Sequence, residues 1–75
     1  MAPGTPITYT SLNPLGATEH PTSTKYIGMV YRGDTGKYVG ILPLDGHDGW
    51  HMTSSEVDDK EVFVAVHESM FQVNA

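Results

Sequence analysis

The chain of 75 residues contains no cysteine, and only four lysines and arginines stand against nine aspartates and glutamates. Without cysteine there is neither a disulfide nor a thiolate zinc site to stabilise a domain of this size, which is marginal on its own. Contacts with a partner, including further copies of the chain, are therefore expected to add stability. The net charge of −5 disfavours binding to nucleic acid or to an anionic membrane.

Long apolar runs and catalytic motifs are also missing. No apolar run approaches the roughly 20 residues of a membrane span, and the N-terminus lacks the basic start and apolar core of a signal peptide. No serine lies in a nucleophile elbow, and the glycines of Gly33–Gly36 are followed by no phosphate-binding lysine and serine or threonine pair. We expect a soluble, unprocessed chain that is not an enzyme and carries no cofactor.

The most informative stretch is residues 25–44, where two runs rich in β-branched and aromatic residues flank the turn Gly33–Gly36. This pattern predicts a β-hairpin. A register that sets Tyr31 opposite Tyr38 also places each strand glycine opposite a bulky residue. The predicted fold class is mainly β, a small antiparallel sheet or partly open barrel built on the 25–44 hairpin.

Residues 1–24 contain four of the five prolines, a single carboxylate and no lysine or arginine. Proline fixes φ and removes a backbone donor, so this composition predicts an extended N-terminal arm in front of a small β-domain at residues 25–75. The arm would dock on its own β-domain, on a neighbouring subunit or on another protein, and ordinary disorder is the alternative. Its apolar candidates for such a contact are Ile7, Tyr9, Leu12 and Leu15.

The C-terminal half predicts more β-structure. An apolar run at residues 62–67 has valines on one face, which indicates a central strand, and residues 70–73 either extend it or form another short strand. His67 is expected to be a satisfied, partly buried side chain. The polar and acidic residues 53–61 are predicted to form a loop.

Trp50 lies in a glycine-containing loop and has two possible roles, a core residue that closes one end of a barrel or an exposed anchor for a partner. The surrounding imidazoles and carboxylates suit a divalent metal ion, but their spacing matches no strong metal signature. We therefore predict a polar loop without a metal site. The residues weighed for that site are Asp45, His47, Asp48 and His51.

Four carboxylates cluster close together in the sequence. They form either a solvated acidic loop or a surface that binds a basic site on a host enzyme or nucleic-acid-binding protein. The members of this acidic patch are Glu56, Asp58, Asp59 and Glu61. A third possibility is an SH3-like or OB-like ligand module, for which the candidate surface aromatics are Tyr26, Tyr31, Tyr38 and Trp50.

Three short segments resemble the head-decoration, or cement, proteins of tailed bacteriophages: Thr22–Lys25 leading into a strand, the turn Gly33–Gly36, and the strand Val39–Leu42. The lambda-type members of that family have a Thr/Pro-rich N-terminal segment before a small β-domain. The resemblance implies trimers or similar clusters seated on capsid subunits, with the arm adding contacts to the shell. It predicts a structural protein of the virion; without it, a cytoplasmic location is expected.

Overall fold

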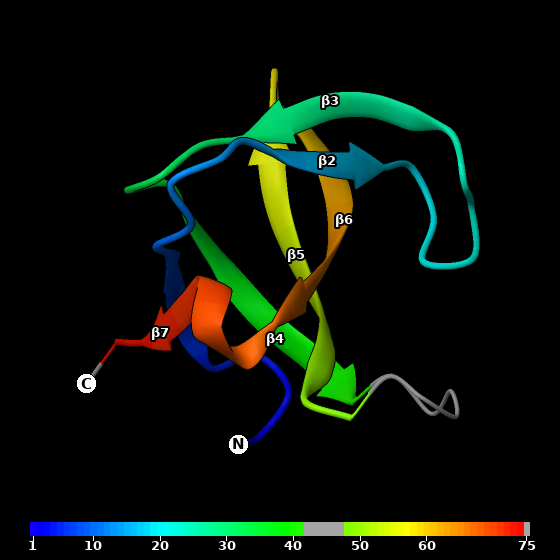
Figure 1. Cartoon of the computed structure of the whole chain (residues 1–75). Helices are drawn as coiled ribbons and strands as arrows, with labels where there is room; N and C mark the ends of the chain where they lie inside the picture. The colour runs from blue at the N-terminus through cyan, green and yellow to red at the C-terminus, as the bar shows by residue number, and fades with distance from the viewer. Residues whose placement is uncertain (42–47, 75) are drawn as a thin grey trace.

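The computed structural model describes residues 1–41 and 48–74 (Figure 1). The elements in chain order are β1 (Pro6–Tyr9), β2 (Leu15–Thr18), β3 (Tyr26–Val30), β4 (Thr35–Ile41), β5 (Trp50–Val57), β6 (Lys60–His67), a 3₁₀ turn η1 (Glu68–Met70), and β7 (Phe71–Val73). All seven strands join one antiparallel sheet in the order β3-β2-β6-β5-β4-β1-β7. The prediction of a mainly β, antiparallel fold is confirmed, and the sheet is open because β3 and β7 remain its two edges.

The longest pairing is the β5–β6 hairpin, which runs in register from Trp50–His67 to Val57–Lys60. The valines of β6 point inward, and Val62, Val64 and Val66 are almost fully buried. The prediction of a central strand at residues 62–67 is confirmed, because β6 has β5 on one side and β2 on the other. The alternative of a separate short strand near the C-terminus is also confirmed, by β7.

Residues 53–61 are not a loop. They form the end of β5, a two-residue turn and the start of β6. Polar side chains enter this strand because their hydroxyls find partners inside it: Thr53 Oγ donates to the Val64 carbonyl at 2.9 Å, and Ser55 Oγ donates to the Thr35 carbonyl at 2.8 Å.

The prediction of a hairpin over residues 25–44 is also wrong. Both of its strands exist, but they do not pair with each other. β3 pairs with β2, and β4 pairs with β5 and β1. The chain turns between them at residues 31–34, where the Tyr31 amide donates to the Asp34 carboxylate and the Asp34 amide donates to the Tyr31 carbonyl. Strand β1 then occupies one side of β4, with Ile7 opposite Gly36. The predicted Tyr31–Tyr38 pair therefore does not form, and the residues beyond Ile41 in that hairpin lie outside the described residues.

Residues 1–24 belong to the domain rather than forming a separate arm. Ile7, Tyr9 and Ala17 are at most 1% exposed and pack in the same core as the valines of β6. The prolines fit because they avoid strand interiors: Pro6 is the first residue of β1, and Pro14 precedes β2. Of the docking alternatives for this segment, the structure shows docking on its own β-domain. Within the described parts of the chain, no helix has the length and apolar character needed to cross a membrane.

Candidate functional site

Strand β3 is an edge of the sheet and carries large apolar side chains toward solvent. We call residues 26–31 the β3 edge. Four of its side chains are substantially exposed: Tyr26 (71%), Ile27 (44%), Met29 (41%) and Tyr31 (56%). An edge strand also presents backbone N–H and C=O groups that its own sheet does not pair. Exposed large apolar side chains on the edge strand of a sheet are typical of an interaction surface.

One half of the β3 edge is irregular. The pairing with β2 shifts between Ala17 and Thr18, so that Ile27 is an extra residue between the partners Tyr26 and Gly28. Such a bulge twists an edge and limits further pairing. The regular part of the edge is therefore residues 28–30. The ring of Tyr26 lies over β2, since a Cβ added at Gly16 would come within 2.7 Å of that ring.

The β3 edge touches the far end of the β5–β6 hairpin, and Figure 1 shows β2 and β3 lying across that end. A Cβ at Gly28 would lie 3.4 Å from Val57 Cγ1, an ordinary van der Waals distance. Beside this contact is a hollow of about 220 Å³ whose apolar lining comes from Ile27, Val57 and Val62. Its charged lining comes from Glu19, Asp58 and Lys60. The apolar edge thus continues into a charged rim.

We call residues 56–61 the hairpin tip. Glu56 and Glu61 are direct partners across β5 and β6, and Asp58 and Asp59 form the turn between the strands, with φ of 52° and 65°. The structure therefore brings the four members of the predicted acidic patch onto one hairpin end. Positive φ is uncommon for any residue with a Cβ, although aspartate and asparagine tolerate it best.

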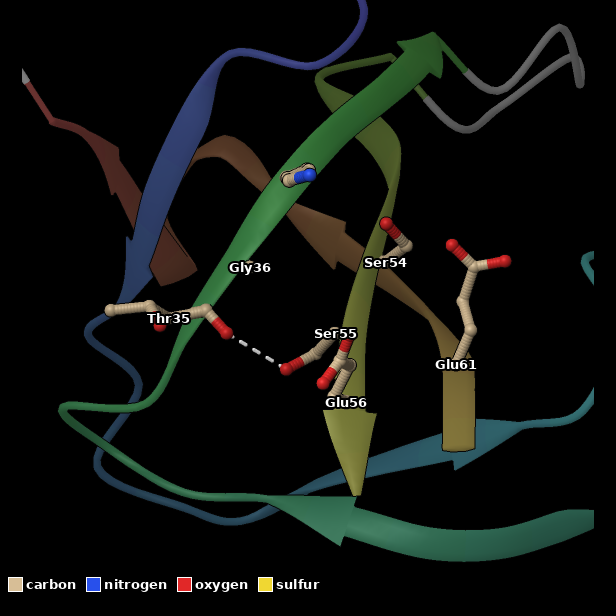
Figure 2. A pocket seen from close by; sticks show the side chains of 7 residues that line it. Thr35, Gly36, Ser54, Ser55, Glu56 and Glu61 are labelled. Atoms are coloured by element: carbon tan, nitrogen blue, oxygen red, sulfur yellow. Dashed lines mark hydrogen bonds between the residues drawn. The ribbon is translucent and has the colours of Figure 1, made fainter. Parts of the chain in front are cut away.

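A second hollow, of about 280 Å³, opens where β4 and β5 separate. The pairing between these strands ends at Lys37 and Ser54. Figure 2 shows Thr35 and Gly36 on β4 facing residues 54–56 on β5, with Glu61 on β6 beyond them. We call this space the fork hollow; its lining residues are Thr35, Gly36, Lys37, Ser54, Ser55, Glu56 and Glu61.

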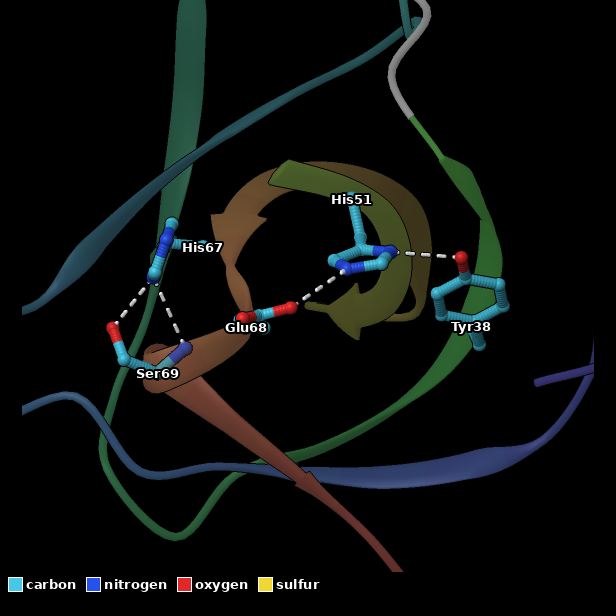
Figure 3. Close-up of polar contacts among 5 residues, drawn as sticks. All are labelled: Tyr38, His51, His67, Glu68 and Ser69. Atoms are coloured by element: carbon cyan, nitrogen blue, oxygen red, sulfur yellow. Dashed lines mark hydrogen bonds and ion pairs between the residues drawn. The ribbon is translucent and has the colours of Figure 1, made fainter. Parts of the chain in front are cut away.

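His51 and His67 belong to a third polar region (Figure 3). His51 Nδ1 lies 2.8 Å from the Tyr38 hydroxyl, and its Nε2 lies 3.9 Å from a carboxylate oxygen of Glu68. His67 Nδ1 accepts a hydrogen bond from the Ser69 amide at 3.2 Å and lies 2.8 Å from the Ser69 hydroxyl. This contact caps η1, so His67 is a satisfied, partly buried side chain, as predicted.

The metal site weighed in the sequence is not assembled by the described residues. Asp45 and His47 lie outside them, and among the residues that are described no group of three or more histidines and carboxylates could hold a metal ion. Trp50 is half-buried and packs edge-on against His67, with ring centroids 5.7 Å apart. It is therefore neither a fully buried core residue nor a fully exposed anchor.

The four apolar residues predicted as partner contacts in the N-terminal segment differ in exposure. Ile7 and Tyr9 are buried in the chain's own core, so in this fold they are unavailable to a partner, and the prediction for them is wrong. Leu15 is half-buried against the same core, whereas Leu12 is 82% exposed.

The sequence did not predict an exposed edge at β3, because the predicted hairpin would have paired β3 with β4. A usable signal was present, since residues 26–31 have apolar side chains on both faces of the strand. So small a domain cannot cover both faces of every strand.

Comparisons with protein-family models, with curated proteins and with solved structures found no match to this chain.

Proposed function

We propose that this chain is a structural interaction protein that self-associates through the β3 edge and adds contacts to a larger assembly. The observation that carries the proposal is the β3 edge, residues 26–31, which has four exposed large apolar side chains in a domain without cysteine. Covering such an edge removes apolar area from water and pairs backbone groups, so association adds stability that a small core supplies only in part.

Decoration of a bacteriophage capsid is the finer form of this proposal, and it is supported by the sequence resemblance. In that role the chain would sit on capsid subunits as a homo-oligomer of the virion. The contact surface differs from the sequence prediction, because Ile7 and Tyr9 are buried and the β3 edge is exposed. Thr22–Lys25, part of the resemblance, leads directly into that edge.

The proposal is tested by the molar mass of the protein in solution, measured by light scattering over a range of concentrations. The wild type should form a defined oligomer, and Met29→Lys should dissociate it, because a charge on an edge opposes pairing with another strand. Ile41→Lys is the matched control, since Ile41 is also exposed (71%) but lies on β4. A wild type that stays monomeric at every concentration contradicts the proposal.

A small acidic binding protein is the second candidate function, favoured by the four carboxylates of the hairpin tip. Such a protein would occupy a basic site on a host enzyme or nucleic-acid-binding protein. Replacing the four carboxylates with their amides should abolish binding to poly-L-lysine together with its salt dependence. Salt-insensitive binding that survives this change counts against the second candidate.

A further inference from the structure

The β3 edge lacks the residues that normally keep two strand edges apart. Residues 26–31 contain no charged side chain and no proline. Charge, proline and short length are the usual means by which an exposed edge avoids another strand. The opposite edge of the sheet, β7, is protected by its length of three residues. Of the two edges, β3 is therefore the one that is open to a further strand.

The bulge at Ile27 limits how much of this edge a further strand can use. Pairing with β2 is regular only at Gly28, Met29 and Val30. The centre of the usable edge is therefore Met29. A second copy of β3, antiparallel and related by a two-fold axis at Met29, would place each Gly28 opposite the other copy's Val30. The small residue then faces the large one in both of these pairs.

The core face of the β3 edge is already covered by the chain itself. Val30 is 1% exposed, and a Cβ at Gly28 would lie 3.4 Å from Val57 Cγ1 of the β5–β6 hairpin. A second copy has little to add on this side of the sheet. New apolar contacts must therefore form on the other face.

The outer face carries the exposed apolar side chains that such a pairing covers. Met29 pairs with Gly16 of β2, and the ring of Tyr26 lies over Gly16, so Tyr26 and Met29 share this face. Antiparallel pairing about Met29 sets the two Met29 side chains next to each other. It also brings Tyr31 of each copy to the Tyr26 end of the other. Cross-strand pairs of large apolar side chains are a stabilising unit of sheets.

The charges near the two ends of the edge are complementary about the same axis. The hairpin tip, with four carboxylates and one lysine, reaches the edge where Ile27 and Asp58 line one hollow. Lys25 precedes the edge at this end and leaves its net charge negative. Arg32 follows the other end and forms no ion pair with any residue of 1–41 and 48–74. Because an antiparallel partner runs in the reverse direction, Arg32 of each copy approaches the hairpin tip of the other.

We infer that β3 pairs with β3 of a second copy, antiparallel about a two-fold axis at Met29, so that one sheet runs through both copies. The inference rests on the proposed function and names its partner and geometry. Covering the four exposed side chains removes roughly 400 Å² per copy from water. The pair then buries about 800 Å² of side-chain surface, less than the roughly 1,200 Å² of a standard interface. The product is a weak, reversible dimer, because a two-fold contact closes at two copies.

The chain has no cysteine, so single cysteine variants test the register directly. Directly opposite residues in an antiparallel pair have Cα atoms about 4.5–5.5 Å apart, within the span of a disulfide. Met29→Cys should therefore form a disulfide-linked dimer in oxidised glutathione, measured by intact mass. Tyr31→Cys is the control on the same edge, since its symmetry mate lies about 14 Å along the strand. Ile41→Cys is the exposed control on β4, and both controls should cross-link at least tenfold more slowly.

A charge reversal tests the ends of the contact. Arg32→Glu sets a carboxylate against the hairpin tip of the other copy and should weaken dimerisation several-fold in sedimentation equilibrium. Lys37→Glu is the matched control, because it changes the net charge equally at an exposed position of β4. That variant should weaken dimerisation less than twofold. Retained NMR amide dispersion in each variant establishes that the fold is intact.

Three outcomes overturn the inference: equal cross-linking of Met29→Cys and Ile41→Cys, a defined trimer, or oligomers whose mass keeps rising with concentration, as head-to-tail pairing of β3 with β7 would produce. In each of these cases, dissociation by Met29→Lys would still support self-association through the β3 edge. A wild type that stays monomeric contradicts the proposed function as well. The failure of the two-fold geometry and the failure of self-association are therefore distinguishable.

Discussion

Tyr9 ends a buried hydrogen-bond chain that ties β1 to β5 and β6. Thr53 uses its only hydroxyl hydrogen in the bond to the Val64 carbonyl, so the Tyr9 hydroxyl is the donor in its 2.8 Å bond to Thr53 Oγ. Tyr9→Phe removes this donor and keeps the ring. Thr53 retains its own bond, and the variant loses the bond to Thr53 together with the longer 3.4 Å contact from the same hydroxyl to the Ser54 carbonyl. The free energy of unfolding should fall by about 1 kcal/mol.

The same residue makes the stability of the fold depend on pH in the alkaline range. Burial raises the pKa of the Tyr9 phenol and the nearby Asp34 carboxylate raises it further, while the hydrogen bond with Thr53 lowers it. The folded chain therefore holds this proton to a higher pH than the unfolded chain, whose tyrosines titrate near the ordinary value of about 10. The contribution to stability is fully present below about pH 10 and is lost as the pH rises through the folded pKa.

Urea denaturation between pH 7 and pH 11, followed by circular dichroism, measures both effects. The stability difference between wild type and Tyr9→Phe should be about 1 kcal/mol at pH 7 and should shrink above pH 10. Tyr31→Phe is the control, because Tyr31 is 56% exposed and outside the core. Equal stabilities at pH 7, or a difference that widens above pH 10, would refute the assignment of Tyr9 to this buried chain.

Three further predictions test the backbone and the extent of the domain. Gly36→Ala should destabilise the fold by about 1–3 kcal/mol in urea denaturation, because its Cβ would overlap the Ser54 carbonyl oxygen, whereas Gly40→Ala meets nothing within 4 Å and should change stability by less than about 1 kcal/mol. Asp59→Gly should raise stability by about 0.5–1 kcal/mol in thermal unfolding, since glycine adopts its φ of 65° without a Cβ penalty. Deleting residues 2–20 removes β1 and β2 and should abolish cooperative unfolding and NMR dispersion; a folded remainder would contradict the domain described above.

Strands β3, β4, β6 and β7 could be predicted from sequence, but β1, β2, β5 and the strand pairing could not. Alternating valines at residues 62–67 identify a buried face without any knowledge of neighbours. The pairing of β3 with β4 looked favourable because side-chain complementarity across a turn is a local property. In the folded chain β4 instead pairs with β1 and β5, and β1 brings Ile7 and Tyr9 into the core from a distant part of the sequence.

In the candidate site, too, features set by residues close in sequence could be predicted and features set by the whole topology could not. The acidic residues meet at the hairpin tip because they are close in sequence and one turn joins their strands. The exposure of Met29 and Tyr31 depends on β3 being the last strand of the sheet, which is a property of the whole topology. The fork hollow was beyond prediction for a related reason, because it exists only where the β4–β5 ladder ends at Lys37 and Ser54.

The hairpin tip departs from the rules of local stability in ways that the core does not. Glu56 faces Glu61, and Asp58 and Asp59 adopt the left-handed conformation that glycine adopts most easily. Oppositely charged or glycine residues would relieve these costs without disturbing the buried residues beneath. Departures of this kind tend to concentrate where a protein binds something. The tip and the core therefore differ in the sign expected on substitution: Tyr9→Phe and Gly36→Ala should lower the free energy of unfolding, whereas Glu61→Gln should raise it, because it removes the like-charge pair with Glu56.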